Sequence, residues 1–184
     1  MKSDIDRWNR KFAGREVGDE PTPDPLLTRC PYLPPGGRAL DVASGSGNNA
    51  VWLAQHGFDV TAIDGSVEGM RLAMALAARR GVRIRPIVAD LDRVTLAGVF
   101  DLVIVMHYLN RPLYRSLHDR LAPGGVLIAK TFNRDFLESR PGFNEDFVLA
   151  TGELCELFGD LEVLDHAESP PSQRGKSHIV CRRR

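Results

Sequence analysis

Cysteine is scarce in this sequence, and the few cysteines lie far apart. There are three among 184 residues, Cys30, Cys155 and Cys181, and no two form a C-x-x-C pair. An odd number of widely spaced cysteines predicts neither a disulfide framework nor a cysteine zinc site, and it is typical of a reducing compartment. The five histidines form no metal-ligand pattern such as H-E-x-x-H, so we expect no bound metal.

The sequence also lacks net charge and long apolar runs. The 24 Lys and Arg side chains balance 24 Asp and Glu side chains, which gives no overall field that would favour nucleic acid. The basic run Arg182, Arg183 and Arg184 is more often a solvated tail than a phosphate contact, and its role stays open. No apolar run has the length of a signal-peptide core or a membrane span. We therefore expect a cytoplasmic protein with a small-molecule partner, bound to neither nucleic acid nor membrane.

What the sequence does contain is an alternation of strand-like and helix-like segments. Apolar runs suited to strands occupy residues 38–43, 58–63, 83–88, 100–105 and 126–132, and they alternate with segments of helical pattern, each about one helix plus its turns in length. This alternation predicts an α/β domain with a parallel sheet and helices on both faces. Two further strand-like runs, 161–167 and 177–183, have no helical segment between them, which predicts an antiparallel hairpin.

Two of the intervening helices have clear signals. Ser66 is placed to cap a helix over 67–80, and Gly81 is placed to end it. Residues 111–125 also have the pattern of a helix followed by a turn, with leucines at helical spacing before a Pro-Gly-Gly turn. The residues expected to face the core in these helices are Leu72, Met74, Ala75, Leu76, Leu113, Leu117 and Leu121.

The segments on either side of the alternation are irregular. Residues 21–37 carry six prolines and end in Gly-Gly, which predicts an extended lead-in rather than a helix. Trp8 and Phe12, four residues apart, indicate an N-terminal helix whose apolar face either packs on the core or closes over a ligand. Residues 131–158 form an insertion with loop-like and helical parts. We therefore divide the chain into an N-terminal helix and lead-in, 1–37, and a single domain, 38–184.

A glycine loop follows the first strand-like run. Gly45 and Gly47 allow a tight turn and a close approach of a ligand to the next helix. The loop also satisfies a relaxed dinucleotide pattern, with Asp64 at the ribose spacing, so an NAD-dependent oxidoreductase is a competing interpretation. Asp41 favours another ligand, because a carboxylate there would repel a pyrophosphate and attract an ammonium or a sulfonium. S-adenosylmethionine carries both cations and no phosphate.

Two further acids fit the same ligand. The Asp64 carboxylate, ending the second strand, is suited to accept from both hydroxyls of a ribose. Asp90, after the third strand, is suited to accept from an adenine amino group, although an acid after a strand often only caps the following helix. The three acids around one glycine turn are more specific than any one of them.

These stretches together resemble a known family. Residues 39–66, the run "ADLD" at 89–92, "FDLVIV" at 100–105 and "RLAPGGVLIAKTF" at 120–132 are similar to the class I S-adenosylmethionine-dependent methyltransferases. The resemblance covers about residues 38–132 and, with the closing hairpin, most of the chain. The nearest subgroup looks like the small bacterial tellurite-resistance-type methyltransferases, whose N-terminal segment and lid resemble residues 7–12 and 140–158.

The resemblance implies a fold and a set of cofactor contacts. The fold is a Rossmann-like seven-stranded sheet of order 3-2-1-4-5-7-6 in which only strand 7 is antiparallel. The implied contacts are the methionyl part with Asp41, Ala43, Ser44, Gly45 and Gly47, the ribose with Asp64, Gly65 and Ser66, adenine with Asp90 and Leu91, and the methyl group with Met106 and His107. The sequence departs from the family at Ala43, where glycine is usual, and at Ser44.

The acceptor side is less defined by the sequence. Ligands of open α/β sheets lie where the strand order reverses, here between the first and fourth strands, so the loop after the fourth strand faces the transferable methyl. His107 and Tyr108 are the candidate catalytic residues in that loop, and Trp8, Tyr108, Arg111, Arg134 and Arg140 are the candidate acceptor contacts. Each also has a plain structural interpretation as a packing residue or a solvated charge.

The function predicted from the sequence is methyl transfer from S-adenosylmethionine to a small-molecule acceptor by in-line displacement. The donor is already activated, so the protein must mainly align the nucleophile and exclude water. A non-catalytic S-adenosylmethionine-binding protein is the main alternative, and an NAD-dependent oxidoreductase is a weaker one. The acceptor, the accepting atom, the use of a base and the oligomeric state stay open.

Overall fold

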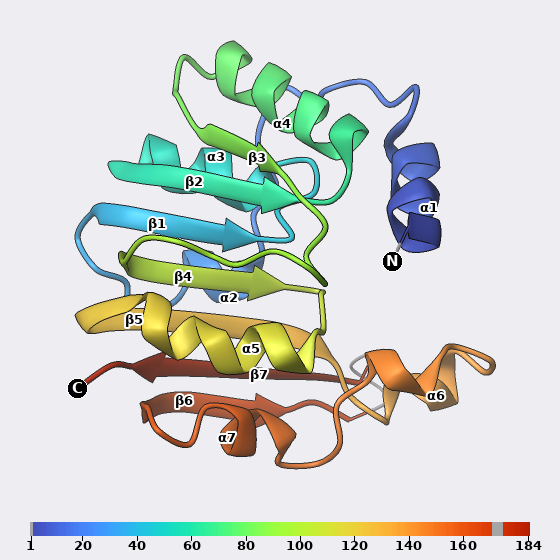
Figure 1. The fold of residues 1–184 in the computed structure, drawn as a ribbon, viewed down its shortest axis with the longest axis vertical. Coiled ribbons are helices and arrows are strands. Elements are labelled where there is room, and N and C mark those ends of the chain that lie inside the picture. Colours follow the sequence, from blue (N-terminus) through green and yellow to red (C-terminus); the bar gives the residue numbers. More distant parts are fainter. Residues whose placement is uncertain (1, 171–174) are drawn as a thin grey trace.

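A seven-stranded sheet with helices on both faces forms the molecule (Figure 1). The computed structural model describes residues 2–170 and 175–184. The strands are β1 Gly37–Val42, β2 Phe58–Asp64, β3 Arg85–Val88, β4 Phe100–Met106, β5 Leu121–Phe132, β6 Glu162–Glu168 and β7 Lys176–Arg182. Their order is β3-β2-β1-β4-β5-β7-β6, and β7 is antiparallel to both β5 and β6 while the remaining pairs are parallel. The predicted fold is confirmed.

The central strands each contain a buried apolar stretch because both of their faces are covered. In β4, Val103 and Val105 belong to one buried cluster, and Leu102 and Ile104 belong to the cluster on the other side of the sheet. Alternating side chains point to opposite faces of a strand, so a strand buried on both faces needs a continuous apolar run. These strands place their carboxyl ends along one edge of the sheet.

The helices divide between the two faces. The cluster on one face includes residues of α2 Pro25–Thr28, α3 Asn48–Gln55 and α4 Val67–Arg79. The other includes residues of α5 Arg111–Leu117, which continues into the 3₁₀ turn η1 His118–Arg120, and of α7 Glu153–Leu157. The insertion also holds α6 Phe136–Ser139 and the 3₁₀ turn η2 Glu145–Phe147, and α1 Lys2–Phe12 begins the chain (Figure 1). Within the described ranges, no helix is long and apolar enough to cross a bilayer.

Three local predictions were wrong. The lead-in contains a helical turn, α2, because the Asp24 carboxylate accepts a hydrogen bond from the Leu26 N–H at 2.9 Å and Pro25 takes the first helical position, where its missing N–H costs nothing. Met74 is 40% exposed, and its neighbour Ala75 is exposed as well. The buried stripe of α4 instead comprises Gly69, Met70, Leu72, Ala73, Leu76 and Ala77.

The third difference concerns the second leucine-spaced helix. The α-helix ends at Leu117, and Leu121 is the first residue of β5, where it pairs with Phe100 before the register shifts. Leu121 is fully buried, but as a strand residue. The spacing of three leucines therefore predicted the burial correctly and the helix end incorrectly.

Candidate functional site

The glycine loop connects β1 to α3 at the carboxyl edge of the sheet. Gly45 and Gly47 have φ angles of 55° and 77°, and Ala43 has a φ of 57°. The left-handed region suits glycine and strains alanine, which gives a physical reason for the glycine usual at position 43 in the family. A Cβ on Gly47 would lie 2.4 Å from the Cβ of Ala73, so this glycine is needed for α3 to pack on α4.

Asp41 lies beneath this loop. Its side chain is buried, with 1% of its surface exposed, and it accepts a hydrogen bond from the Ser44 hydroxyl at 2.8 Å. Burial, together with the nearby charge of Asp64, raises the pKa of Asp41 to about 7 despite the hydrogen bonds from Ser44 and the Ala50 N–H. The structure therefore places the Asp41 carboxylate against the loop rather than in the open.

Asp64 ends β2 and holds two turns together. One carboxylate oxygen accepts from the Gly45 N–H at 2.8 Å, and the other accepts from the Ser66 N–H at 2.7 Å. Burial raises the pKa of Asp64, while hydrogen bonds from the backbone N–H groups of Ser66, Gly45 and Gly65 oppose that rise. The loop after β1 and the turn after β2 are thus joined through one carboxylate.

The N-terminal helix α1 packs against the loop after β1 and the turn after β2. The Phe12 ring would contact a Cβ on Gly45 at 3.3 Å, and it is itself buried. The Asn9 amide oxygen accepts from the Ser66 hydroxyl at 2.7 Å, and Ile5 lies 3.0 Å from a Cβ position on Gly65. Trp8 stacks on Phe12 with ring centroids 5.6 Å apart and is 37% exposed. In Figure 1, α1 stands at the same end of the molecule as the arrowheads of β1 and β2.

The residues after β3 and β4 also meet at this edge. The Asp90 carboxylate accepts from the Asp92 N–H at 3.0 Å, so it caps a local turn, and Leu91 is buried. Met106, the last residue of β4, is 7% exposed, whereas the neighbouring His107 is exposed and has a φ of 60°. Ala43 and His107 are the non-glycine residues with positive φ in the described ranges, and they follow adjacent strands.

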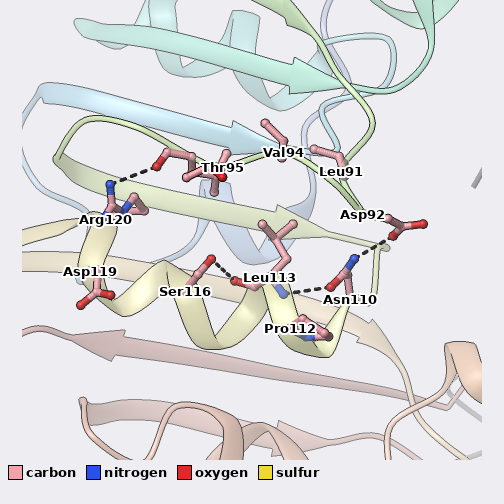
Figure 2. A pocket seen from close by; sticks show the side chains of 11 residues that line it. Leu91, Asp92, Val94, Thr95, Asn110, Pro112, Leu113, Ser116, Asp119 and Arg120 are labelled. Carbon is pink, nitrogen blue, oxygen red and sulfur yellow. Dashed lines mark hydrogen bonds between the residues drawn. The ribbon is translucent and has the colours of Figure 1, made fainter.

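A hollow of about 260 Å³ lies between the segment after β3 and α5 (Figure 2). Leu91 and Asn110 line it, and the Asn110 side chain donates to the Asp92 carboxylate at 2.8 Å. The Tyr108 hydroxyl donates to the same carboxylate at 3.4 Å. Burial raises the pKa of Tyr108 far above its ordinary value, so the structure gives its phenol no tendency to act as a base at neutral pH.

The candidate acceptor cations have different environments. Arg111 donates to the Glu153 carboxylate and, at 2.8 and 3.0 Å, to the backbone oxygens of Asp146 and Val148. It therefore fastens α5 to the insertion, and we assign it no acceptor role. Arg134 and Arg140 are exposed on the insertion.

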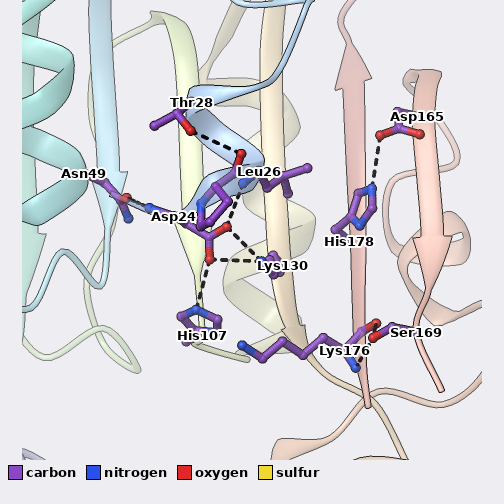
Figure 3. Close-up of polar contacts among 11 residues, drawn as sticks. Asp24, Leu26, Thr28, Asn49, His107, Lys130, Asp165, Ser169, Lys176 and His178 are labelled. Carbon is purple, nitrogen blue, oxygen red and sulfur yellow. Dashed lines mark hydrogen bonds and ion pairs between the residues drawn. The ribbon is translucent and has the colours of Figure 1, made fainter. Parts of the chain in front are cut away.

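Sequence reasoning missed two charged residues beside His107 (Figure 3). Asp24 accepts from the Lys130 ammonium at 2.8 Å and contacts the His107 Nε2 at 3.2 Å. The Asp24 N–H also donates to the Asn49 side chain at 2.9 Å, which fixes the lead-in on α3. The Asp-Pro pair at 24–25, an N-cap followed by proline at the first helical position, is the signal that would have found this turn.

No three His, Cys, Asp or Glu side chains of residues 2–170 and 175–184 are grouped as they would be around a metal ion. Cys30 and Cys155 are half-buried, Cys181 is buried, and all three are free thiols.

Comparison with known proteins identifies the domain. Residues 39–125 match the family model described as "Methyltransferase domain". This stretch, a little less than half of the chain, is therefore similar to a methyltransferase domain. This domain contains the glycine loop and the acids that end or follow β1, β2 and β3, and the whole chain has the class I methyltransferase fold predicted from the resemblance.

Among curated relatives, a ubiquinone biosynthesis O-methyltransferase of Caulobacter sp. (strain K31) is 36% identical over 106 residues, which are 54% of this chain and 42% of that protein. The chain thus spans less than half of that relative. The structure of TehB from Haemophilus influenzae has a TM-score of 0.70 at 17% identity and covers 80% of this chain and 57% of that chain. An S-adenosylmethionine-dependent methyltransferase from Clostridium acetobutylicum has a TM-score of 0.70 at 14% identity and covers 99% of this chain and 98% of that chain. At these identities the structures show a shared fold.

Proposed function

We propose that the protein is an S-adenosylmethionine-dependent methyltransferase that acts on a small-molecule acceptor. The observation that carries the proposal is a pair of carboxylates at the ends of neighbouring strands, the buried Asp41 and the half-buried Asp64, on either side of one glycine loop in a stretch similar to methyltransferase domains. Burial raises the pKa of both groups, so a cationic ligand beside the loop would relieve an existing electrostatic cost. S-adenosylmethionine supplies such a cation, and a diphosphate would increase the cost.

The donor set fits the cofactor. The Asp64 carboxylate already accepts from the backbone N–H groups of Gly45, Ser66 and Gly65, and a carboxylate has about four acceptor sites, which leaves capacity for a ribose hydroxyl. Asp41 acts through the Ser44 hydroxyl and through its charge rather than by open contact. The adenine contacts stay with Asp90 and Leu91 and the methyl contacts with Met106 and His107, as the resemblance implies. When bound, the sulfonium supplies an activated methyl group.

We further propose that α1 covers the bound cofactor. Phe12 lies against the glycine loop, and Asn9 is hydrogen-bonded to Ser66 at the start of α4. An apolar cover at this position would exclude water from the donor, which an in-line displacement requires. Trp8, on the exposed side of the same stack, is available to an acceptor.

The first test measures cofactor choice. Calorimetry should show binding of S-adenosylhomocysteine and none of NADH, and binding of NADH alone would contradict the proposal. Asp64→Asn keeps an acceptor oxygen for the loop but loses the charge, and it should weaken binding about tenfold, equivalent to about 1.5 kcal/mol. Asp59→Asn removes an exposed carboxylate from the same strand and is the matched control. Equal losses in the two variants would refute the ribose assignment.

The second test separates an enzyme from a cofactor-binding protein. The protein is incubated with isotopically labelled S-adenosylmethionine and a metabolite extract, and labelled products are identified by mass spectrometry. Labelled small molecules support the proposal. Binding without any labelled product would favour the non-catalytic alternative, and label in RNA or protein fractions would replace the small-molecule acceptor.

A further inference from the structure

Three segments far apart in the sequence bring a charged cluster together at the carboxyl ends of β4 and β5 (Figure 3). Asp24 comes from the lead-in, His107 follows β4, and Lys130 lies in β5. The Asp24 carboxylate contacts the Lys130 ammonium at 2.8 and 3.1 Å and the His107 Nε2 at 3.2 Å. The Asp24 and Lys130 side chains are 8% and 18% exposed, whereas the His107 side chain is 39% exposed. The imidazole is therefore the accessible member of a largely buried cluster.

The geometry fixes which ring nitrogen of His107 is available. Nε2 faces the carboxylate, which can only accept, so Nε2 carries the proton of this hydrogen bond. Nδ1 has no hydrogen-bond partner among the described residues. The neutral ring with hydrogen on Nε2 has its lone pair on Nδ1, so the open nitrogen is the one that can accept a proton.

The backbone of His107 has an unfavourable conformation. Its φ of 60° lies in the left-handed region, which strains a non-glycine residue. The His107 N–H donates to the Lys130 backbone oxygen at 2.7 Å, which ties the strained residue to β5. Val42 pairs with Val105, so the residue before His107 is level with Ala43, and His107 follows the strand next to the one that leads into the glycine loop. Strain of this kind at the point where the strand order reverses is typical of a functional residue.

Lys130 places a positive charge beside the Asp24 carboxylate. Burial alone would raise the pKa of Asp24, but hydrogen bonds from His107, Lys130 and the Leu26 N–H hold that pKa well below its usual range. The carboxylate is therefore ionised, and Lys130 already supplies one positive charge to it. A proton that His107 takes up from an acceptor lies beside this carboxylate. The titratable side chains near the ring are Asp24 from the lead-in, Lys130 from β5 and Lys176 from β7, whose ammonium lies 5.5 Å from the centre of the Phe132 ring (Figure 3).

The surface next to the imidazole is aromatic. The Phe132 ring lies 5.8 Å from the His107 ring between centroids, and Phe136 stacks on Phe132 at 4.0 Å. Phe143, also from the insertion, meets both rings edge-on. All three phenylalanines are half-buried, so part of each ring stays accessible. A planar aromatic acceptor that packs on these rings would bring a ring hydroxyl to the imidazole.

We propose that His107 is the general base for methylation of an aromatic hydroxyl, and that Asp24 and Lys130 are positioning residues that keep its Nδ1 open and unprotonated. This inference rests on the proposed methyltransferase function. In the step, the acceptor O–H proton passes to Nδ1 and the oxygen forms a bond to the methyl carbon. The carbon–sulfur bond of S-adenosylmethionine breaks, and its electron pair stays on sulfur to give S-adenosylhomocysteine. The imidazolium formed is balanced by Asp24.

The test uses the full chain, labelled S-adenosylmethionine and two catechol probes, catechol and the more acidic 4-nitrocatechol. His107→Asn keeps a residue type that tolerates positive φ, so the loop should survive. We expect kcat with catechol to fall about 10²- to 10⁴-fold. The loss should shrink strongly with 4-nitrocatechol, because an acceptor that is already ionised needs no base. A purely structural role would lower both rates equally.

The pH profile separates the two positioning residues. Lys130→Met leaves the carboxylate balanced only by the histidine, so the acid limb of the kcat profile should move to higher pH by about one unit. Asp24→Asn should lower kcat about tenfold or more and should move the acid limb to lower pH, because the ring loses the partner that fixes its tautomer and stabilises its charge. His178→Asn, which disrupts a second His–Asp pair at 3.0 Å on β7, is the matched control and should leave kcat unchanged.

The outcomes distinguish this inference from the proposed function. Failure to bind S-adenosylhomocysteine would refute both. Binding of S-adenosylhomocysteine without methylation of either probe, or methylation that His107→Asn leaves unchanged, would overturn the aromatic-hydroxyl base and keep the methyltransferase. Turnover only of amines or thiols under the same conditions would overturn it as well.

Discussion

The burial of Asp41 predicts a specific dependence of stability on pH. Its pKa is raised from 3.8 to about 7 by burial first and by the charge of Asp64 second. Between these values the folded protein binds a proton that the unfolded chain has lost, so the free energy of unfolding decreases as pH rises from about 4 to about 7 and is level above that. One pKa unit corresponds to about 1.4 kcal/mol, so the decrease due to this group is about 4 kcal/mol at most.

The perturbation is Asp41→Asn, which keeps the shape and removes the ionisation. We expect the variant and the original protein to have similar stability near pH 4. At pH 8 the variant should be more stable by a few kcal/mol, reduced by the free energy lost where the amide replaces a carboxylate oxygen that accepts from the Ser44 hydroxyl. Urea unfolding at half-unit pH steps measures the difference. Asp59→Asn, at an exposed site, controls for the loss of one negative charge.

A stability difference between Asp41→Asn and the original protein that does not change with pH would refute this reasoning, and so would one of opposite sign. The ligand adds an independent check. A cation beside the loop favours the ionised carboxylate, so S-adenosylmethionine binding at pH 6 should release a proton from the original protein and fewer from Asp41→Asn. Calorimetry in two buffers of different ionisation enthalpy measures this release.

Further predictions concern the loop and the insertion. Gly47→Ala should lower the free energy of unfolding by about 2 to 4 kcal/mol, because residue 47 has a φ of 77° and the added Cβ would lie 2.4 Å from the Cβ of Ala73 in α4. Gly81→Ala, where the added Cβ meets nothing within 4 Å, should lower it by about 1 kcal/mol in the same unfolding assay. Ala43→Gly should stabilise the protein by about 0.5 to 1 kcal/mol in thermal unfolding by relieving its positive φ, and a loss of stability would contradict the strain. Arg111→Met should cost about 1 to 3 kcal/mol, because it leaves Glu153 unpaired, and should speed proteolysis of the insertion while cofactor affinity stays unchanged.

The sequence predicted the sheet well because each strand carries a local signal. A run buried on both faces must be apolar throughout, and the two final strands have no room for a crossover between them, which predicts their antiparallel pairing. Met74 shows the limit of such signals. An amphipathic pattern identifies α4 as a helix, but the side of the helix that is buried depends on its rotation against the sheet. Tertiary packing sets that rotation.

The chemistry at the carboxyl edge of the sheet was also only partly predictable from the sequence, because it depends on tertiary packing. That Asp41 and Asp64 belong to one site follows from their positions after neighbouring strands. That Asp41 is buried under Ser44 rather than open to the ligand depends on how the loop folds over it, which no residue pattern shows. Arg111 is the converse case, because its partner Glu153 lies 42 residues further along the chain.

The first and last residues of the family match separate the glycine loop from part of the His107 cluster. Residues 39–125 include the glycine loop and both acids that flank it, but Asp24 precedes that range and Lys130 follows it. The acids that we propose to bind the donor thus lie within the matched range, whereas the cluster around His107 forms between the lead-in and β5, largely outside it. Likeness to relatives therefore predicts the cofactor far better than the acceptor, and the Asp24–Lys130 contact is where this chain's own specificity has to be sought.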